Sequence, residues 1–155
     1  LRSRTAMSFL DGVSVGKKGG EIVDAGAATK GKVVALYFSA MWCAQCRTFT
    51  PKLKRFYDEM KEAGKPFEVI LVSRDREADD LLEYFNDHNG DWLHLQFGDE
   101  KIQEFLAKFE VSGIPALRVV KPDGTLAVKE AKDELKEKID EDPLALFDEW
   151  QKKSA

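Results

Sequence analysis

Runs of consecutive apolar residues, bounded by turn residues, predict the central strands of this chain. Residues 33–40 read VVALYFSA and residues 67–73 read FEVILVS. Continuous apolar and β-branched runs of this length are typical of strands that are buried on both faces of a sheet. Residues 114–120, IPALRVV, form a third run whose proline lies near its start, where a missing N–H is tolerated.

Apolar residues at helical spacing predict helices between these strands. The first helix begins near Cys43 and ends before Gly64. Residues 77–86 predict a second helix with an acidic outer face, and residues 102–109 predict a third. We expect a loop that holds both histidines between the second and third helices. The C-terminal tail is helical again and is interrupted at Pro143.

Turn residues predict a hairpin at each end of this pattern. Residues 9–31 are rich in glycine and contain short apolar pairs, which predicts a small hairpin ahead of the core. Residues 122–124, PDG, form a tight turn into residues 125–128, which predicts an antiparallel hairpin after the third strand. The order of elements therefore predicts an α/β domain whose first central strands are parallel and whose last hairpin is antiparallel.

Composition excludes several classes of function. The 155 residues are 43% hydrophobic and 34% charged, the balance of an ordinary globular domain with its own core. With 24 basic and 28 acidic residues the net charge is −4, and no basic stripe interleaved with aromatic residues appears. We therefore expect no nucleic-acid partner. No apolar run approaches the roughly 20 residues that span a bilayer, so we expect no membrane partner.

The opening LRSRTA, before Met7, reads as a cloning remnant. A processed leader upstream is the alternative interpretation. No charged segment followed by an apolar one opens the chain, so we expect no secretory signal. We expect residues 1–6 to be the remnant and residues 7–155 to form a single domain.

Both cysteines lie in the stretch SAMWCAQCR, residues 39–47, three positions apart. Cys43 directly follows a predicted strand at the start of a predicted helix, and Cys46 lies one turn inside that helix. The free N–H groups and the dipole of a helix N-terminus favour a thiolate over a thiol, and Arg47 adds positive charge nearby. A thiolate at Cys43 can attack a disulfide, and Cys46 can then resolve the mixed disulfide.

Other interpretations of the cysteine pair are a metal site, two inert buried thiols and a Cys–His nucleophile. A zinc site needs four ligands, but the chain has no second CxxC and only two histidines, His88 and His94, so we expect no metal. Hydrolytic catalysis needs a paired base, which the sequence does not place. Two cysteines in one motif are not a disulfide scaffold, so we expect a reducing compartment, the cytoplasm, with the nucleus as an alternative.

The segment YFSAMWCAQCRTFTPKLKRFYDEM, residues 37–60, resembles the active-site strand and helix of the tryparedoxin and nucleoredoxin branch of the thioredoxin superfamily. The resemblance continues through VSRDREADDLLEYF, WLHLQF and FEVSGIPALRVVKPDG. It implies a thioredoxin fold, in which a central mixed β-sheet is flanked by helices and carries the N-terminal β-hairpin as an extension.

The resemblance also implies roles for individual residues. Cys43 is the expected nucleophile and Cys46 the resolving thiol. Trp42 is expected to shield the site. Ile114 and Pro115 are expected to contact substrate, with the bond between them in cis and facing the cysteines.

The implied activity is thiol–disulfide exchange, as in a protein-disulfide reductase. Its expected substrates are proteins that contain disulfides or low-molecular-weight thiols, and an upstream thiol reductant restores the dithiol. No cofactor is expected, because the two cysteines carry the electrons. The alternative is a redox-sensitive protein-binding module with little turnover.

The chain departs from this family between the two cysteines, where Ala44 and Gln45 replace the usual two prolines. We expect Ala44, Gln45 and Arg47 to tune the redox potential, with the restored N–H of Gln45 favouring the thiolate. Tyr37 occupies the position at which thioredoxin carries a buried acid, so no carboxylate is expected beside Cys46.

A second departure lies in residues 74–76, Arg-Asp-Arg, where trypanothione-using relatives carry a tryptophan and acidic residues. Only the aspartate is kept, which argues against the use of trypanothione. We expect Asp75, with Glu77, Asp79 and Asp80, to cap the start of the following helix.

Overall fold

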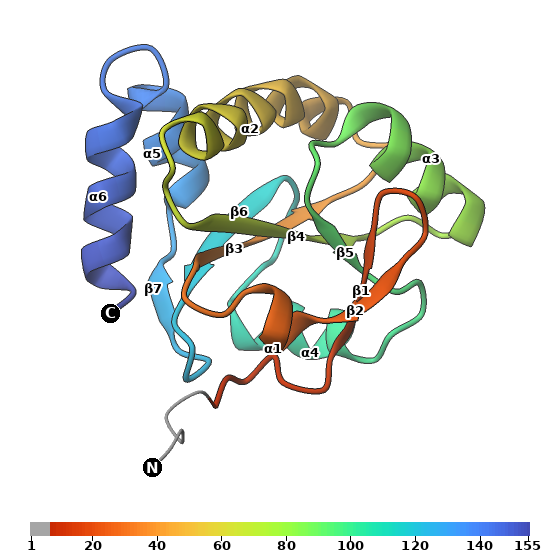
Figure 1. The fold of residues 1–155 in the computed structure, drawn as a ribbon. Coiled ribbons are helices and arrows are strands. Elements are labelled where there is room, and N and C mark those ends of the chain that lie inside the picture. The colour runs from red at the N-terminus through yellow and green to blue at the C-terminus, as the bar shows by residue number, and fades with distance from the viewer. Residues whose placement is uncertain (1–6) are drawn as a thin grey trace.

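A computed structural model describes residues 7–155 (Figure 1). The strands are β1 (Ser14–Lys17), β2 (Ile22–Asp24), β3 (Val33–Ser39), β4 (Phe67–Ser73), β5 (Leu93–Leu95), β6 (Ala116–Val120) and β7 (Leu126–Val128). The helices are α1 (Ala25–Ala28), α2 (Ala44–Glu62), α3 (Ala78–His88), α4 (Lys101–Lys108), α5 (Ala131–Lys138) and α6 (Pro143–Lys153). The expected cloning remnant, residues 1–6, lies outside the described residues.

The seven strands of the described residues form one mixed sheet in the order β2-β1-β5-β4-β3-β6-β7. β3 pairs in parallel with β4 over its full length, from Val33 opposite Phe67 to Ser39 opposite Ser73. β3 pairs on its other side with β6, which is antiparallel, and β7 continues antiparallel to β6. The parallel centre and the antiparallel last hairpin are therefore confirmed.

Helices cover both faces of the sheet, so β3 and β4 are buried throughout (Figure 1). One face packs against α2, α3, α5 and α6, and the other packs against α1 and α4. Successive side chains of a strand point to opposite faces, so alternate residues of β3 enter opposite cores. Val33, Ala35 and Tyr37 enter the first core, and Val34, Leu36 and Phe38 enter the second.

The N-terminal hairpin is part of the sheet. β1 pairs antiparallel with β5 and carries β2 on its outer edge, so the expected extension is confirmed. Gly16 lies opposite His94 in this pairing, and a Cβ at this position would overlap the imidazole ring. The short helix α1, which follows β2 directly, had no signal in the sequence pattern.

The expectation that a loop holds both histidines is wrong. His88 is the last residue of α3, and His94 lies in the buried strand β5. His94 Nδ1 lies 2.8 Å from the carbonyl oxygen of Leu95, and Phe85 packs edge-on against the ring at 4.5 Å between centroids. Burial lowers the pKa of His94, which keeps the ring neutral. A strand of three residues is too short for its alternation to be recognised in a sequence.

The C-terminal tail forms two helices, α5 and α6, so the expected interruption is confirmed. Pro143 lies at the end of the interruption, as the first residue of α6. At this position the missing N–H has no intrahelical partner to lose. Asp142 caps the same helix by accepting a hydrogen bond from Ala145 N at 3.1 Å. Among residues 7–155, no helix is long and apolar enough to cross a membrane.

Candidate active site

The loop between β3 and α2 positions both cysteines. Cys43 is the N-cap residue of α2, with extended backbone angles (φ −95°, ψ 112°), and its sulfur accepts a hydrogen bond from Cys46 N at 3.2 Å. The sulfur therefore occupies the place of a capping oxygen at the positive end of the helix dipole. Both cysteines are free thiols; Cys43 is half-buried and Cys46 is fully buried.

The two thiols differ in electrostatic environment. Burial, together with a hydrogen bond that the Cys46 thiol donates to Cys43, raises the pKa of Cys46 to about 12. The hydroxyl of Ser39 and the backbone of Ala40 act in the opposite direction through hydrogen bonds. Cys46 is therefore a protonated thiol at neutral pH. Because Cys43 alone of the two has access to solvent, the geometry fits an attacking Cys43 and a resolving Cys46.

Four buried hydroxyl groups lie beneath the cysteines, and we call them the hydroxyl cluster: Tyr37, Ser39, Thr50 and Tyr84. The Thr50 hydroxyl lies 2.6 Å from that of Tyr37 and 2.9 Å from that of Tyr84, which also bonds Ser39. Thr50 and Tyr37 donate to the carbonyl oxygen of Cys46 at 2.8 and 3.3 Å. The cluster therefore holds the first turn of α2 through neutral groups.

Burial raises the pKa of Tyr37 and Tyr84, so both phenols stay protonated. The groups that influence the pKa of Cys46 include no carboxylate, in agreement with the sequence argument from Tyr37. The buried carboxylate Glu68 belongs elsewhere, where it accepts a hydrogen bond from Tyr57 at 3.0 Å. Sequence reasoning missed Ser39, Thr50 and Tyr84, because only the packing of α3 on α2 brings Tyr84 to the other two.

Asp75 does not cap α3, which corrects the sequence prediction. The N-cap residue is Glu77, whose side chain makes no capping hydrogen bond, while Asp79 and Asp80 do lie in the first turn. Asp75 is buried, and its carboxylate accepts hydrogen bonds from Met41 N at 2.9 Å and from the Ser73 hydroxyl at 2.6 Å. The side chain therefore ties the end of β4 to the loop that carries the cysteines.

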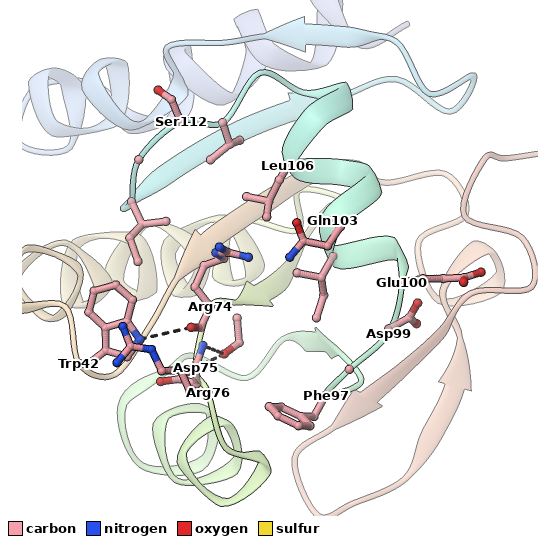
Figure 2. A pocket seen from close by; sticks show the side chains of 16 residues that line it. Trp42, Arg74, Asp75, Arg76, Phe97, Asp99, Glu100, Gln103, Leu106 and Ser112 are labelled. Carbon is pink, nitrogen blue, oxygen red and sulfur yellow. Dashed lines mark hydrogen bonds between the residues drawn. The ribbon is translucent and has the colours of Figure 1, made fainter.

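Trp42 and Ile114 flank Cys43. Trp42 is 54% exposed, its Nε1 donates to the carbonyl oxygen of Arg74 at 3.3 Å, and the Arg76 guanidinium lies 5.4 Å from the centre of its ring (Figure 2). The Ile114–Pro115 bond is cis, as the resemblance implies, and the Cys43 thiol lies 4.0 Å from the Ile114 carbonyl oxygen. The structure thus brings Ile114, which is distant in sequence, to the sulfur of Cys43.

The three residues expected to tune the potential lie in the first turn of α2. Ala44, Gln45 and Arg47 are exposed, and the Arg47 guanidinium donates to the carbonyl oxygen of Met41. The N–H that reaches the sulfur of Cys43 is that of Cys46 and not that of Gln45. The roles of Ala44, Gln45 and Arg47 in tuning the redox potential stay predictions. Within residues 7–155, no group of three or more metal-binding side chains is arranged to hold an ion.

Comparison with known proteins places the chain in a family. A family model described as thioredoxin-like matches residues 31–126. The chain belongs to the thioredoxin-like family. It is similar to a thioredoxin from Wuchereria bancrofti, with a TM-score of 0.79 and 39% identity over 91% of this chain and 96% of that one. The thioredoxin fold expected from the resemblance is therefore confirmed.

Other relatives confirm the tryparedoxin and nucleoredoxin branch. Probable nucleoredoxin 1 from Arabidopsis thaliana is 43% identical over 103 residues, which are 66% of this chain and 18% of that protein. A structure of tryparedoxin II complexed with glutathionylspermidine has a TM-score of 0.76 and 34% identity over 91% of this chain and 95% of that one. The matched segment spans between 18% and 27% of the length of the curated nucleoredoxins.

Brief treatment with iodoacetamide at neutral pH should label Cys43 and leave Cys46 unlabelled. Cys46 is buried, and its pKa of about 12 leaves almost no thiolate to react. Mass spectrometry of the digested protein measures both labels. Unfolded protein, in which both thiols are accessible, is the control. Preferential labelling of Cys46 in the folded protein would reverse the assignment of the two roles.

Replacing Ser39 with alanine should slow the second step of exchange, in which Cys46 attacks a mixed disulfide on Cys43. The lost hydrogen bond raises the pKa of Cys46 further and lowers its thiolate fraction by about tenfold, the effect of one hydrogen bond to a charged group. Quenched-flow mass spectrometry of the mixed disulfide measures the rate, which should also rise with pH above neutrality.

Thr48→Ala is the matched control for Ser39→Ala, because the Thr48 hydroxyl bonds the carbonyl oxygen of Ala44 on the exposed side of the same helix. Its resolution rate should equal that of the unmodified chain. An unchanged resolution rate in Ser39→Ala would show that the hydroxyl does not stabilise the Cys46 thiolate.

Proposed function

We propose that this chain is a thiol–disulfide oxidoreductase in which Cys43 attacks and Cys46 resolves. One observation carries the proposal. The half-exposed sulfur of Cys43 caps the start of α2, and the fully buried Cys46 lies one turn inside the helix, with its backbone nitrogen 3.2 Å from that sulfur. Membership of the thioredoxin-like family and the nucleoredoxin and tryparedoxin relatives support the same activity.

The proposed reaction proceeds in two exchanges. The Cys43 thiolate attacks one sulfur of a substrate disulfide; that S–S bond breaks, a bond from Cys43 to substrate forms, and the other substrate sulfur leaves as a thiolate that takes up a proton. Cys46 then loses its proton and attacks the Cys43 sulfur, which releases the second substrate thiol. The protein ends with a Cys43–Cys46 disulfide and has given two electrons to the substrate.

A thiol reductant must then return two electrons to the protein, so we propose an upstream dithiol or low-molecular-weight thiol as its partner. The proposed substrates are disulfides of proteins or of small thiols, and the glutathionylspermidine held by a solved tryparedoxin II supports the second class. We propose Trp42, Ile114 and Pro115 as the substrate contacts, because two of them flank the attacking sulfur. The cysteines carry both electrons, so the cycle uses no metal or organic cofactor.

We propose the cytoplasm or the nucleus as the location of this activity. The two cysteines lie in one exchange motif and not in a disulfide scaffold, and a reducing compartment keeps such a pair as the dithiol. We propose no nucleic-acid partner in either compartment, because a chain with a net charge of −4 has no overall electrostatic attraction to nucleic acid.

Cys46→Ser should accumulate mixed disulfides with substrates, whereas Cys43→Ser should accumulate few. Cys43 forms the intermolecular bond, and only Cys46 is placed to release it. Non-reducing electrophoresis with mass spectrometry counts the adducts, and the double Cys→Ser variant gives the background. Equal trapping by both single variants would mean that the two cysteines do not have separate roles.

A redox-sensitive binding module is the second candidate, and the exposed indole of Trp42 beside the sulfur favours it, because such a surface suits protein contact. Steady-state reduction of insulin by the unmodified chain, with a chemical dithiol as reductant, separates the candidates. We expect many turnovers for each protein molecule. Capture of one substrate per molecule without turnover would support the binding module instead.

A further inference from the structure

A groove of about 780 Å³ opens beside the cysteines (Figure 2). Trp42 and Ile114, which flank Cys43, line one end of it. Residues 73–76 line it where β4 ends, and α4 forms the facing wall through Ile102, Gln103 and Leu106. A volume of this size is typical of pockets for small ligands, which are about 300–1,000 Å³. A small molecule in the groove therefore has one end next to the attacking sulfur.

Two arginines give the sulfur end of the groove a positive charge. The Arg74 side chain points into the groove, with the Gln103 amide on the facing wall, and the Arg76 guanidinium lies over Trp42 (Figure 2). Within residues 7–155, neither guanidinium forms an ion pair. Both charges are therefore available to a ligand.

The acidic residues of the groove offset the charge of these arginines only in part. The carboxylate of Asp75 is already bonded to Met41 N and to the Ser73 hydroxyl. Asp99 accepts a hydrogen bond from Lys101 N at 2.8 Å, and Asp99 and Glu100 lie at the far end of the groove from Trp42 (Figure 2). Next to the sulfur, the two guanidinium groups outnumber the single carboxylate of Asp75, so residues 74–76 carry a net positive charge.

We infer that this groove is a subsite for low-molecular-weight disulfides that carry a carboxylate close to the sulfur–sulfur bond. Arg74 and Arg76 bind the carboxylate, which presents the neighbouring disulfide to Cys43. Guanidinium groups suit this task because they bind carboxylates through paired N–H donors. Substrates with ammonium groups at the same place are repelled. The inference rests on the proposed function and names the substrate class of the same site.

The subsite acts on capture and not on the exchange itself. The bonds made and broken at Cys43 are the same for every disulfide, but a carboxylate held by the arginines raises the fraction of encounters that place the disulfide at the sulfur. The preference should therefore weaken as salt concentration rises, because salt screens exposed charges.

The test measures mixed-disulfide formation in a Cys46→Ser background, where the captured substrate stays bound. The probes are three alkyl disulfides of similar size: dithiodipropionate, which is anionic, hydroxyethyl disulfide, which is neutral, and cystamine, which is cationic. Arg74→Gln with Arg76→Gln should lower the capture rate constant of dithiodipropionate by about tenfold, the product of two exposed charge pairs. The rate with hydroxyethyl disulfide should stay the same, and that with cystamine should rise.

Lys136→Gln with Lys152→Gln is the control for the loss of two positive charges, because both lysines are exposed on α5 and α6 and neither lines the groove. Its three rate constants should match those of the Cys46→Ser background. Comparing each variant with that background for the same disulfide removes the different intrinsic reactivities of the three probes.

An equal loss with all three disulfides would overturn the subsite, because it would mean that the arginines only hold Trp42 in place. No capture of dithiodipropionate by the Cys46→Ser background would overturn it as well. Turnover of the unmodified chain is measured separately. Selective capture without turnover would contradict the proposed oxidoreductase function and support the subsite. Turnover with no charge preference would support the oxidoreductase function and contradict the subsite.

Discussion

The hydrogen bond from Cys46 N to the sulfur of Cys43 is the contact on which the site depends. It makes the first cysteine the cap of α2 and puts the second one turn inside, so a single helix start gives the two sulfurs different environments. The position of that helix start is fixed by β3, which lies between β4 and β6 and is buried along its whole length. A shift of β3 by one residue would send Tyr37 into the opposite core and displace the cysteines.

The hydroxyl cluster gives this site a neutral foundation. A buried carboxylate beside Cys46 would oppose formation of the Cys46 thiolate through like charge, although it could accept the proton. The bonded hydroxyls of Tyr37, Thr50 and Tyr84 instead fill the space without charge, and their network satisfies the polar groups that burial would otherwise leave unpaired. The cost of ionising Cys46 is then set mainly by burial and by its contacts with Cys43 and Ser39.

The surface around the sulfur of Cys43 is assembled from three separate segments. Asp75 fastens the end of β4 to Met41, and the indole of Trp42 is bonded to the backbone at Arg74, so the cysteine loop and residues 73–76 are held as one unit. The segment before β6 completes the surface with Ile114. In the proposed reaction, the groove charges that a substrate meets come from the end of β4, while the reacting thiols come from the segment that follows β3.

The sequence by itself determined the central strands, the long helices and the cysteine pair at a helix start. These signals are local: β3 and β4 are continuous apolar runs, and α2 shows helical spacing from Phe49 to Met60. Resemblance to a family added Trp42, Ile114 and Pro115 as candidate site residues. Such elements can be recognised in the sequence because burial of both strand faces, or of one helix face, requires apolar residues at regular positions along the whole element.

Only the tertiary structure decided the pairing of β5 and the place of His94, the bracing role of Asp75 and the hydroxyl cluster. β5 has only three residues, so it is recognised as a strand by its pairing with β1 and β4 and not by an alternation of apolar and polar residues. From the sequence, Asp75 is expected to cap the helix that follows it. In the structure, its carboxylate instead accepts a hydrogen bond from Met41 N in the cysteine loop. Likewise Thr50 and Tyr84 are 34 positions apart, and their hydroxyls meet only when α3 packs on α2. Each of these roles depends on a partner distant in the chain, and no local pattern of apolar and polar residues specifies that partner.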